Sequence, residues 1–363
     1  MSKIVCLLIG NIKYDGRVKK EIYSLSEAGH DVSLIVSMHD ENDETDYHCK
    51  LIHLPRNNGG SFLSKLFRNA TYIFRVTKAI KKEKPDFVHC NDLNTLILTF
   101  MLPQSIKIVY DSHEIYPETR NGFASRVFFT FAEKYLVYKT CKIIVPQIDR
   151  LHYIYFKYKL PLSHYVLLEN FPLKAIIPQK NFWERKYGIN TKDKFVVSYI
   201  GALTKEREVE DIIRAMQYVP VKVVLFIIGP GGNEYEKKLK DVVESLHFEK
   251  QVYMFDRISN SEVLEAEASS DIGICIYNAK NLNSYFCASN KVYEYLDYGA
   301  KVITTDIGGM SRIIKNGANG HKLKEITSKN IANSINDLIT KDENFEANYF
   351  WENQVNNYLD IFC

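Results

Sequence analysis

The sequence predicts an α/β protein made of two successive domains, each built on a parallel β-sheet. Its 363 residues suit two domains of the ordinary size of about 100–200 residues. Hydrophobic residues make up 46% and charged residues 25%, which excludes disordered, collagen-like and coiled-coil chains. Short apolar runs alternate with longer amphipathic stretches almost from end to end. This rhythm is typical of parallel strands joined by helices.

The first half opens with this pattern. Ile4–Ile9 is an apolar run, Val18–Ala28 has apolar residues at helical spacing, and Val32–Val36 is apolar again. We therefore expect a strand, a helix and a second strand. Further short strands are predicted at Phe87–Cys90, Lys107–Tyr110 and Lys142–Pro146, with helical segments between them.

The pattern weakens between Lys174 and Asp193, which we interpret as a linker, and then restarts. Strands are predicted at Phe195–Ile200, Val221–Ile228, Gln251–Phe255, Ile272–Ile276 and Val302–Thr305, and helices at Val209–Met216, Tyr235–Leu246, Ser261–Ala268 and Lys291–Leu296. The aromatic residues of the remaining segment indicate a last amphipathic helix. The predicted domains are residues 1–173 and 174–340, followed by a helix at 341–363.

The composition also indicates the cellular compartment and the classes of partner to expect. The seven cysteines are scattered and form no CxxC motif, so neither a disulfide framework nor a zinc site is predicted. The longest uncharged stretch, Leu93 to Ile106, has 14 residues, fewer than the roughly 20 that a spanning helix needs. A net charge of +3 is too small for a dedicated nucleic-acid binder. We expect a soluble cytoplasmic protein that binds no nucleic acid.

Residues 61–84 concentrate positive charge. Seven Lys and Arg residues stand against Glu83 alone, and aromatic and aliphatic residues are interleaved with them. A basic amphipathic helix with aromatic residues is typical of segments that lie on an anionic membrane. The ordinary alternative is a solvated basic face on a helix that covers a sheet. Both interpretations stay open.

Ligands of parallel sheets bind at the carboxyl ends of the strands, so the loops there are the candidate sites. The loop Gly10–Arg17 does not match GxGxxG, which disfavours a nicotinamide or flavin dinucleotide. Gly16, at a helix start, could offer a backbone N–H to a phosphate or only form a turn. Gly229–Gly232 is followed by no Lys-Ser/Thr pair and is interpreted as a turn rather than a phosphate loop.

One loop of the second half combines a glycine with a cation. Arg207 follows Gly201 after a predicted strand, and it could clamp a phosphate with two hydrogen bonds. The alternative is an exposed arginine that pairs with Glu210 or Asp211.

A second candidate site lies at a predicted helix start, where Ser289, Asn290 and Lys291 precede Glu294. Ser289 is a candidate N-cap, and the N-terminal amides together with Lys291 would face an anion. Glu294 could accept two hydrogen bonds from neighbouring hydroxyl groups. The alternative is a carboxylate that interacts only with the helix dipole.

Two polar segments of the first half, His89–Asp92 and Asp111–Glu114, each follow a predicted strand and each place a histidine beside carboxylates. A metal site would lack third and fourth ligands at a recognisable spacing. Contacts with sugar hydroxyls or acid–base chemistry suit these residues better, and a polar loop network is the alternative.

Taken together and in this order, these segments resemble the retaining glycosyltransferases of the GT-B fold, specifically glycosyltransferase family 4. The resemblance covers nearly the whole chain. Asp15–Val18, Phe87–His89, Tyr110–Glu114 and Leu168–Asn170 match the amino-terminal landmarks of the family, and Gly201–Ala215 matches its phosphate-binding loop and helix. Ser289–Tyr295, followed by Gly299 and Val302–Gly309, resembles the donor-nucleotide motif and is the specific match.

The resemblance implies two Rossmann-like domains that face a cleft, an acceptor-binding domain followed by a donor-binding domain, with the carboxy-terminal helix crossing back to the first. It implies that Glu294 holds the ribose of a nucleotide-sugar donor and that Asn290 and Lys291 lie near the diphosphate. Gly16, Gly201 and Arg207 would complete the donor site, and His113 would touch the donor sugar. Further sugar or acceptor contacts are expected from Asp15, Arg17, Asp92, Glu114 and Phe286.

Three positions depart from the family pattern. Ala202 stands where members commonly have Arg, and Arg207 stands where they usually have Lys, so one of two diphosphate-binding cations is missing. The family has paired glutamates, of which Glu294 is the second, while Phe286 stands at the first. This departure bears on how the hydroxyls of the donor sugar are held, and it predicts a less polar sugar, such as a deoxysugar.

The implied reaction transfers a glycosyl group from a nucleotide-diphosphate sugar to a polysaccharide or lipid-linked acceptor, with retention at the anomeric carbon. Arg207, Lys291 and helix N-terminal amides would stabilise the departing diphosphate, His113 would be the third catalytic residue, and no metal or other cofactor is expected. The setting would be cell-surface glycan synthesis, with residues 61–84 on the inner face of the cell membrane. The alternatives are a nucleotide-sugar epimerase or phosphorylase on a similar frame, and an inactive donor-binding subunit.

Overall fold

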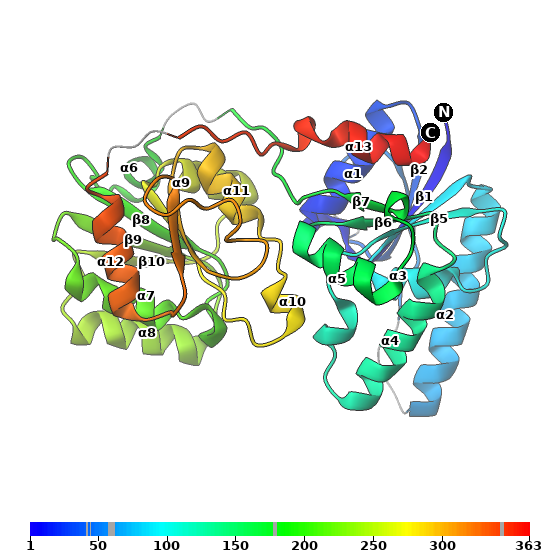
Figure 1. Ribbon diagram of the computed structural model, residues 1–363, viewed down its shortest axis with the longest axis horizontal. Coiled ribbons are helices and arrows are strands. Elements are labelled where there is room, and N and C mark those ends of the chain that lie inside the picture. Colours follow the sequence, from blue (N-terminus) through cyan, green and yellow to red (C-terminus); the bar gives the residue numbers. More distant parts are fainter. Residues whose placement is uncertain (41–42, 44, 57–61, 177–179, 342–344) are drawn as a thin grey trace. The chain divides into compact units, whose positions relative to one another are not determined.

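The chain folds into two compact units (Figure 1). The computed structural model describes residues 1–40, 43, 45–56, 62–176, 180–341 and 345–363, and the backbone alone at residues 62–66. Unit 1 comprises Met1–Asn170 and Trp351–Cys363, and unit 2 comprises Phe171–Phe350. Each unit has its own parallel sheet, so the predicted α/β architecture of two Rossmann-like units is confirmed.

The sheet of unit 1 has seven strands among the described residues, in the order β3-β2-β1-β4-β5-β6-β7. The strands are β1 (Lys3–Asn11), β2 (Asp31–Met38), β3 (Lys50–His53), β4 (Phe87–Asn91), β5 (Lys107–Asp111), β6 (Lys142–Val145) and β7 (Tyr165–Leu167). Val5 and Leu7 of β1 pack into one hydrophobic cluster, and Ile4 and Cys6 pack into another on the opposite face. Because helices cover both faces, the strands are continuous apolar runs rather than alternating ones.

Helices divide between the two faces of this sheet. Side chains of α2 (Phe62–Glu83), α3 (Leu93–Leu96), α4 (Phe123–Val137) and α5 (Ile148–Tyr158) pack into the cluster on one face. On the other face lie α1 (Gly16–Glu27) and the carboxy-terminal α13 (Val355–Leu359). The chain therefore returns to unit 1 after completing unit 2.

The carboxy-terminal segment corrects the expected helix at 341–363. Its helical part consists of short pieces from Trp351 to Phe362. The described residues before it are not helical: Phe345, Ala347 and Tyr349 alternate along the chain and pack against a core cluster of unit 2. Alternate residues share a face only in an extended chain, so this stretch crosses unit 2 without a helix.

The sheet of unit 2 has six strands in its described part, in the order β10-β9-β8-β11-β12-β13. The strands are β8 (Phe195–Ile200), β9 (Val223–Ile228), β10 (Val252–Phe255), β11 (Ile272–Cys275), β12 (Lys301–Thr305) and β13 (Gly320–Leu323). One face is covered by α7 (Val209–Ala215), α8 (Asn233–Ser245) and α12 (Ser328–Leu338). The other is covered by α6 (Phe182–Tyr187), α9 (Asn260–Ala268) and α11 (Asn290–Asp297), and α10 (Leu282–Tyr285) is a single short turn.

Helix α6 corrects the interpretation of residues 174–193 as a linker. Phe182 and Trp183 are each 1% exposed. The Trp183 ring stacks on Phe226 of β9 with ring centroids 4.0 Å apart, and its Nε1 donates to the backbone oxygen of Ser269 at 2.9 Å. Because charged residues surround these two core residues in the sequence, the apolar pattern of the helix is not apparent there.

Among all the described helices, none is both long and apolar enough to span a membrane.

The two tryptophans of the chain give a matched test of the two cores. Trp351 is 1% exposed, and its Nε1 donates to Ser24 Oγ of α1 at 2.8 Å. Trp351→Ala should cost unit 1 about 3–5 kcal/mol of unfolding free energy, the usual cost of deleting a buried aromatic side chain. Trp183→Ala should have the same effect on unit 2. Hydrogen exchange measured peptide by peptide should show lost protection in a different unit for each variant, and loss across both units from either variant would contradict this assignment of cores.

Candidate active site

A cavity of about 240 Å³ lies at the carboxyl ends of β8 and β11 in unit 2. It brings together Gly201, Arg207 and Lys291, three of the residues predicted to bind the donor. A larger hollow of about 540 Å³ lies at the amino-terminal ends of the strands, beside Phe195 and Lys301. Parallel sheets bind ligands at the carboxyl ends of their strands, so the smaller cavity is the candidate site.

The floor of this cavity depends on a close approach of two loops. Gly229, which ends β9, has a φ of +152°, and a Cβ there would lie 1.8 Å from the backbone oxygen of Gly201. Leu203 N donates to the backbone oxygen of Pro230 at 2.8 Å. The sequence predicts a turn at Gly229–Gly232, but Gly231 instead forms an isolated parallel bridge with Leu203. Gly229 lets the loop after β8 lie against this segment.

Tyr277, which no local sequence motif marks, connects the separate parts of the cavity. The Arg207 guanidinium carbon lies 3.4 Å from the centroid of the Tyr277 ring. The Tyr277 hydroxyl donates to Ser289 Oγ at 3.1 Å, and its backbone N–H donates to Thr305 Oγ1 at 3.0 Å. A cation held over an aromatic face is stabilised by the ring quadrupole. Arg207 is therefore fixed at the cavity wall.

The expected alternative for Arg207 is not what the structure shows. Glu210 pairs with Arg214 at 2.9 Å and with Lys238 at 2.5 Å, and Asp211 accepts from the backbone N–H of Ser328 at 3.2 Å. Both carboxylates thus have other partners.

Lys291 lies between two carboxyl groups on neighbouring helices. Its Nζ is 2.8 Å from Oε1 of Glu267 on α9 and 3.9 Å from Oε2 of Glu294, one turn along α11. Glu267 is fully buried, and its Oε2 has no hydrogen-bond partner among the described residues. Burial, opposed by Lys291 and reinforced by Glu294, raises the pKa of Glu267 to about 8. Burial lowers the pKa of Lys291, but Glu267 and Glu294 outweigh burial and raise this pKa above its ordinary value, so Lys291 is a cation at neutral pH.

The start of α11 corrects one detail of the prediction. Ser289 is the N-cap residue, but its side chain makes no capping hydrogen bond to the described backbone and instead accepts from Tyr277. Asn290 is the first residue of the helix and is half-buried. Phe286 lies at the end of α10 with its ring 5.0 Å from that of Tyr285, and it is not among the described residues that line the cavity.

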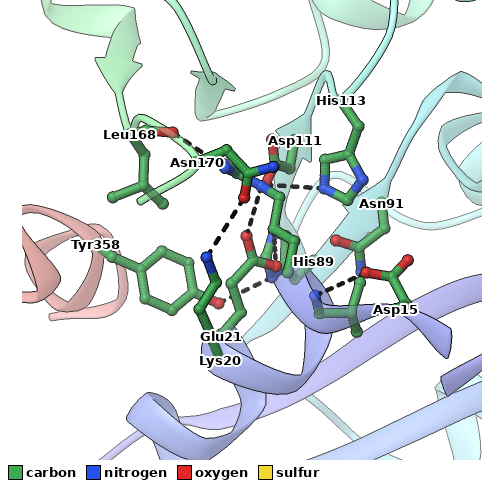
Figure 2. A network of polar contacts seen from close by, with 12 residues as sticks. Asp15, Lys20, Glu21, His89, Asn91, Asp111, His113, Leu168, Asn170 and Tyr358 are labelled. Atoms are coloured by element: carbon green, nitrogen blue, oxygen red, sulfur yellow. Dashed lines mark hydrogen bonds and ion pairs between the residues drawn. The ribbon is translucent and has the colours of Figure 1, made fainter. Parts of the chain in front are cut away.

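Unit 1 holds a buried cluster of charged side chains at the ends of β4 and β5 (Figure 2). Arg17 Nε lies 2.9 Å from Asp111 Oδ2 and 3.1 Å from Glu21 Oε1, and its Nη1 donates to the backbone oxygen of Leu168 at 3.1 Å. Although burial opposes ionisation, Arg17 and His113 hold the pKa of Asp111 well below its usual range. Burial and the Asp111 carboxylate raise the pKa of Glu21 well above its usual range. We therefore assign the charge to Asp111 and a proton to Glu21.

Arg17 is thus buried and paired within unit 1, with 6% of its surface exposed. Its predicted contact with an acceptor stays a prediction. Glu21, His89 and Asp111 offer possible metal ligands within 4.8 Å of one another. The positively charged Arg17 guanidinium already lies between Glu21 and Asp111, so these residues do not fit a metal ion.

His113 faces two carboxylates from the loop after β5. Its Nε2 lies 3.1 Å from Asp111 Oδ2 and its Nδ1 lies 3.8 Å from Asp92 Oδ2. Burial lowers the pKa of His113, but Asp111 and Asp92 outweigh burial and raise it to about 10. Burial raises the pKa of Asp92 to about 6. At neutral pH this imidazolium is a fixed cation rather than a proton-accepting base.

The remaining predicted residues of unit 1 lie around this cluster. Asp15 caps α1 by accepting from Val18 N at 3.0 Å, and the exposed Gly16 begins the helix. The backbone N–H of the exposed Glu114 donates to Asp92 Oδ1 at 3.1 Å. Their proposed contacts with a sugar or an acceptor stay predictions.

The carboxy-terminal segment closes the other side of the cluster. The Tyr358 hydroxyl of α13 lies 3.1 Å from His89 Nδ1 (Figure 2), and His89 Nε2 lies 3.9 Å from Glu21 Oε2. Burial lowers the pKa of His89 to about 4, so this imidazole is neutral. Tyr358 belongs to the functional surroundings that local motifs could not reveal, because it lies 269 residues from His89.

Comparison with known families agrees with this geometry. The profile of the glycosyl transferases group 1 family matches residues 179–353, and that of glycosyltransferase family 4 matches residues 22–151. Both matching profiles describe glycosyltransferases, and together they cover most of the chain. The two matches fall mainly on unit 2 and within unit 1, respectively. A comparison with curated proteins found no match.

Solved structures with the GT-B fold resemble this glycosyltransferase along its whole length. They include Anabaena HepE in complex with UDP and glucose (TM-score 0.71, 15% identity, 99% of this chain and 94% of that chain). Sucrose-phosphate synthase from Thermosynechococcus elongatus matches with a TM-score of 0.73 and 16% identity over 100% and 95% of the two chains. WaaG, a glycosyltransferase involved in lipopolysaccharide biosynthesis, matches with a TM-score of 0.67 and 15% identity over 98% and 94%. At these identities the likeness establishes the fold.

The pKa of Glu267 predicts a pH dependence of the glycosyltransferase's stability. Between about pH 4.5, the ordinary pKa of this carboxyl, and about pH 8, its pKa in the folded protein, the folded protein keeps a proton that the unfolded chain releases. The unfolding free energy contributed by this group therefore falls as pH rises through that window. Glu267→Gln should remove this dependence and flatten the profile.

Denaturant unfolding across this pH window measures the effect. Glu265→Gln is the matched control, since Glu265 lies on the same helix but pairs with Arg185 at the surface, and its profile should follow that of the unmodified protein. Equal pH slopes for Glu267→Gln and the unmodified protein would contradict the assigned protonation.

Proposed function

We propose that this glycosyltransferase moves a sugar from a nucleotide-diphosphate sugar to a polysaccharide or lipid-linked acceptor in cell-surface glycan synthesis, with retention at the anomeric carbon. The observation that carries the proposal is the convergence of Gly201, Arg207 and Lys291 on one cavity. Two cations and a backbone loop at strand ends suit a diphosphate. The crystallised HepE complex contains UDP, which supports a nucleoside diphosphate as the ligand class.

In this proposal the donor lies along the cavity of unit 2. Arg207 and Lys291 contact the diphosphate oxygens, and Asn290 lies beside them at the start of α11. Glu294, 14% exposed at its side chain and already near Lys291, accepts hydrogen bonds from the two ribose hydroxyls. Glu267 lies beneath Lys291 and directs its ammonium.

The chemical step needs stabilisation of the leaving group. The bond between the anomeric carbon and the diphosphate oxygen breaks, and a bond to an acceptor oxygen forms on the same face of the sugar. The acceptor hydroxyl proton passes to the departing phosphate oxygen. Arg207 and Lys291 stabilise the charge that develops there, and because these cations are fixed in place we propose that no metal or other cofactor is required.

Two further assignments belong to this proposal. The charged His113 contacts the donor sugar, with Asp92 and Asp111 holding its ring. Phe286, a half-buried ring where the family has a carboxylate, favours a donor sugar with fewer hydroxyls. None of the seven cysteines forms a disulfide, which fits a reducing compartment, and we place the reaction in the cytoplasm.

Turnover separates this proposal from the alternatives. Free nucleoside diphosphate that accumulates only when an acceptor is added indicates transfer. Conversion of a nucleotide sugar without acceptor would indicate an epimerase, and donor binding without turnover on any acceptor would indicate a binding subunit.

Arg207→Ala should reduce turnover about 100-fold or more, the usual loss when one transition-state hydrogen-bond donor is removed. Its effect on the unfolding free energy should be about 1 kcal/mol or less, since the side chain loses only its stacking on Tyr277. Steady-state kinetics with Lys205→Ala as the control tests this, because Lys205 is an exposed cation of the same turn. A larger loss from Lys205→Ala than from Arg207→Ala would move the role to Lys205.

Glu294→Gln should weaken binding of a ribonucleoside diphosphate by about 1–3 kcal/mol, because a charged acceptor of two hydrogen bonds is replaced by a neutral group with one accepting oxygen. The loss should nearly vanish for a 2′,3′-dideoxy analogue, which has no hydroxyls to hold. Calorimetry with both ligands makes the comparison. An equal loss for both would instead point to an effect through Lys291.

A further inference from the structure

Helix α4 and Tyr138, the residue that caps its carboxyl end, expose a row of aromatic rings. Phe128, Phe131, Tyr135 and Tyr138 are 60%, 68%, 55% and 56% exposed. Their spacing of three, four and three residues places them on one face of the helix. The opposite side of α4 packs Leu136 and Val137 into the core. Single exposed apolar residues are common on protein surfaces, but a continuous row marks an interaction surface.

The row continues toward α2 through a short 3₁₀ turn, Ile97–Thr99, which lies against both helices. Phe100 follows that turn, is 55% exposed, and has its ring centroid 6.1 Å from that of Tyr135. The turn contacts both α2 and α4, and both helices cover the same face of the sheet in unit 1 (Figure 1). Phe67 and Phe74 of α2 are 75% and 59% exposed and lie two turns apart on one side of that helix.

Positive charges border these rings. Lys139 lies 4.7 Å from the Tyr135 ring and 5.2 Å from the Phe100 ring. On α2, Lys78, Lys81 and Lys82 are exposed. The part of the predicted basic segment at Ser61 lies outside the described residues, as does the side chain of Lys65.

The carboxylates of the two helices are turned away from this surface. Each helix has one, and both are buried. Glu83 of α2 pairs with Lys50 at 2.7 Å and Lys3 at 3.7 Å. Glu133 of α4 accepts from the Tyr110 hydroxyl at 3.0 Å and pairs with Lys157 at 3.1 Å. The outer surface therefore combines aromatic rings with cations and carries no carboxylate from either helix.

We propose that this surface docks on an anionic lipid bilayer. We call it the α2–α4 face, and it consists of Phe67, Phe74, Phe100, Phe128, Phe131 and Tyr135 together with Lys78, Lys81, Lys82 and Lys139. The rings enter the interfacial layer of the bilayer and the lysines contact lipid phosphates. A second copy of this chain is the less suitable partner. A two-fold contact would place the same patch on both sides, so that lysines would oppose lysines.

This proposal extends the expectation for residues 61–84 by adding α4 and the connecting turn, neither of which that segment contains. It adds a membrane surface to the proposed function and does not require that the donor or the reaction be as proposed. The experiment can therefore be done without nucleotide or acceptor, and its failure would leave the transfer reaction untouched.

Flotation of the full-length protein with vesicles tests the proposal. The vesicles are phosphatidylcholine alone, or phosphatidylcholine with about one third phosphatidylglycerol, at salt concentrations of about 0.05 M and 0.5 M. The protein should float with the anionic vesicles at low salt and not with neutral ones. Phe128→Gln/Phe131→Gln should reduce the partition coefficient about tenfold or more. Lys78→Glu/Lys81→Glu/Lys82→Glu should reduce it about 100-fold or more.

Matched variants on unit 2 control for net charge and surface hydrophobicity. Lys237→Glu/Lys240→Glu/Lys250→Glu changes the charge equally at exposed positions, and Tyr218→Gln/Val221→Gln removes two exposed apolar side chains. Both should bind vesicles as the unmodified protein does. Phe131→Trp should show blue-shifted emission on anionic vesicles and quenching by lipids brominated along their chains.

Three outcomes would overturn the proposal: no flotation with anionic vesicles, equal losses from the α2–α4 variants and their unit 2 controls, or tryptophan emission that vesicles leave unchanged. A concentration-dependent dimer that Phe128→Gln/Phe131→Gln dissociates, without vesicle binding, would assign this face to a second copy instead. Circular dichroism and thermal unfolding of each variant show whether a variant that has lost vesicle binding is still folded.

Discussion

Parallel strands covered by helices on both faces leave only their ends for polar chemistry, and this constraint organises both units. The strand interiors are apolar on each side, so charged groups gather where the strands stop. In unit 1 these groups follow β4 and β5, where Asp92, Asp111 and His113 lie. In unit 2 they follow β8 and β11, where Arg207 and Tyr277 lie. The location of the chemistry therefore follows from the sheet before any particular residue is considered.

Each unit places one cation between two carboxyl groups, and the two cations differ in how exposed they are. Arg17 is almost completely buried and reaches Asp111, Glu21 and the backbone after β7. Removing one partner of such a buried group would leave an uncompensated charge at a cost of about 3–5 kcal/mol. Lys291 has the same arrangement, but its side chain is 27% exposed and lines a cavity. An anion can approach Lys291, whereas Arg17 is 6% exposed and is already paired with Asp111 and Glu21.

How much of this could be predicted depends on the range of the interaction. The strands and most helices follow local apolar periodicity, and the convergence of Gly201, Arg207 and Lys291 follows from their positions after strands or at a helix start. Local patterns could not reveal Glu267, because its contact with Lys291 joins two helices across 24 residues of chain. They also could not reveal that Arg17 is buried and paired, since its partner Asp111 lies 94 residues away. The aromatic row of α4 is likewise not predictable from local patterns, because the sequence shows that these residues are apolar but only packing shows that they stay exposed.

The stacking of Arg207 on Tyr277 bears on the cation that the family pattern would place at Ala202. Tyr277 is itself held by Ser289 and Thr305, so the guanidinium lies over a ring that has little freedom to move. A flexible cation loses conformational entropy when an anion binds, and a cation already fixed beside the cavity loses less. The guanidinium also presents several N–H donors in one plane, which an ammonium does not. In the proposed donor complex, a single fixed arginine together with Lys291 of α11 can therefore supply much of the stabilisation of the diphosphate that two mobile cations would provide.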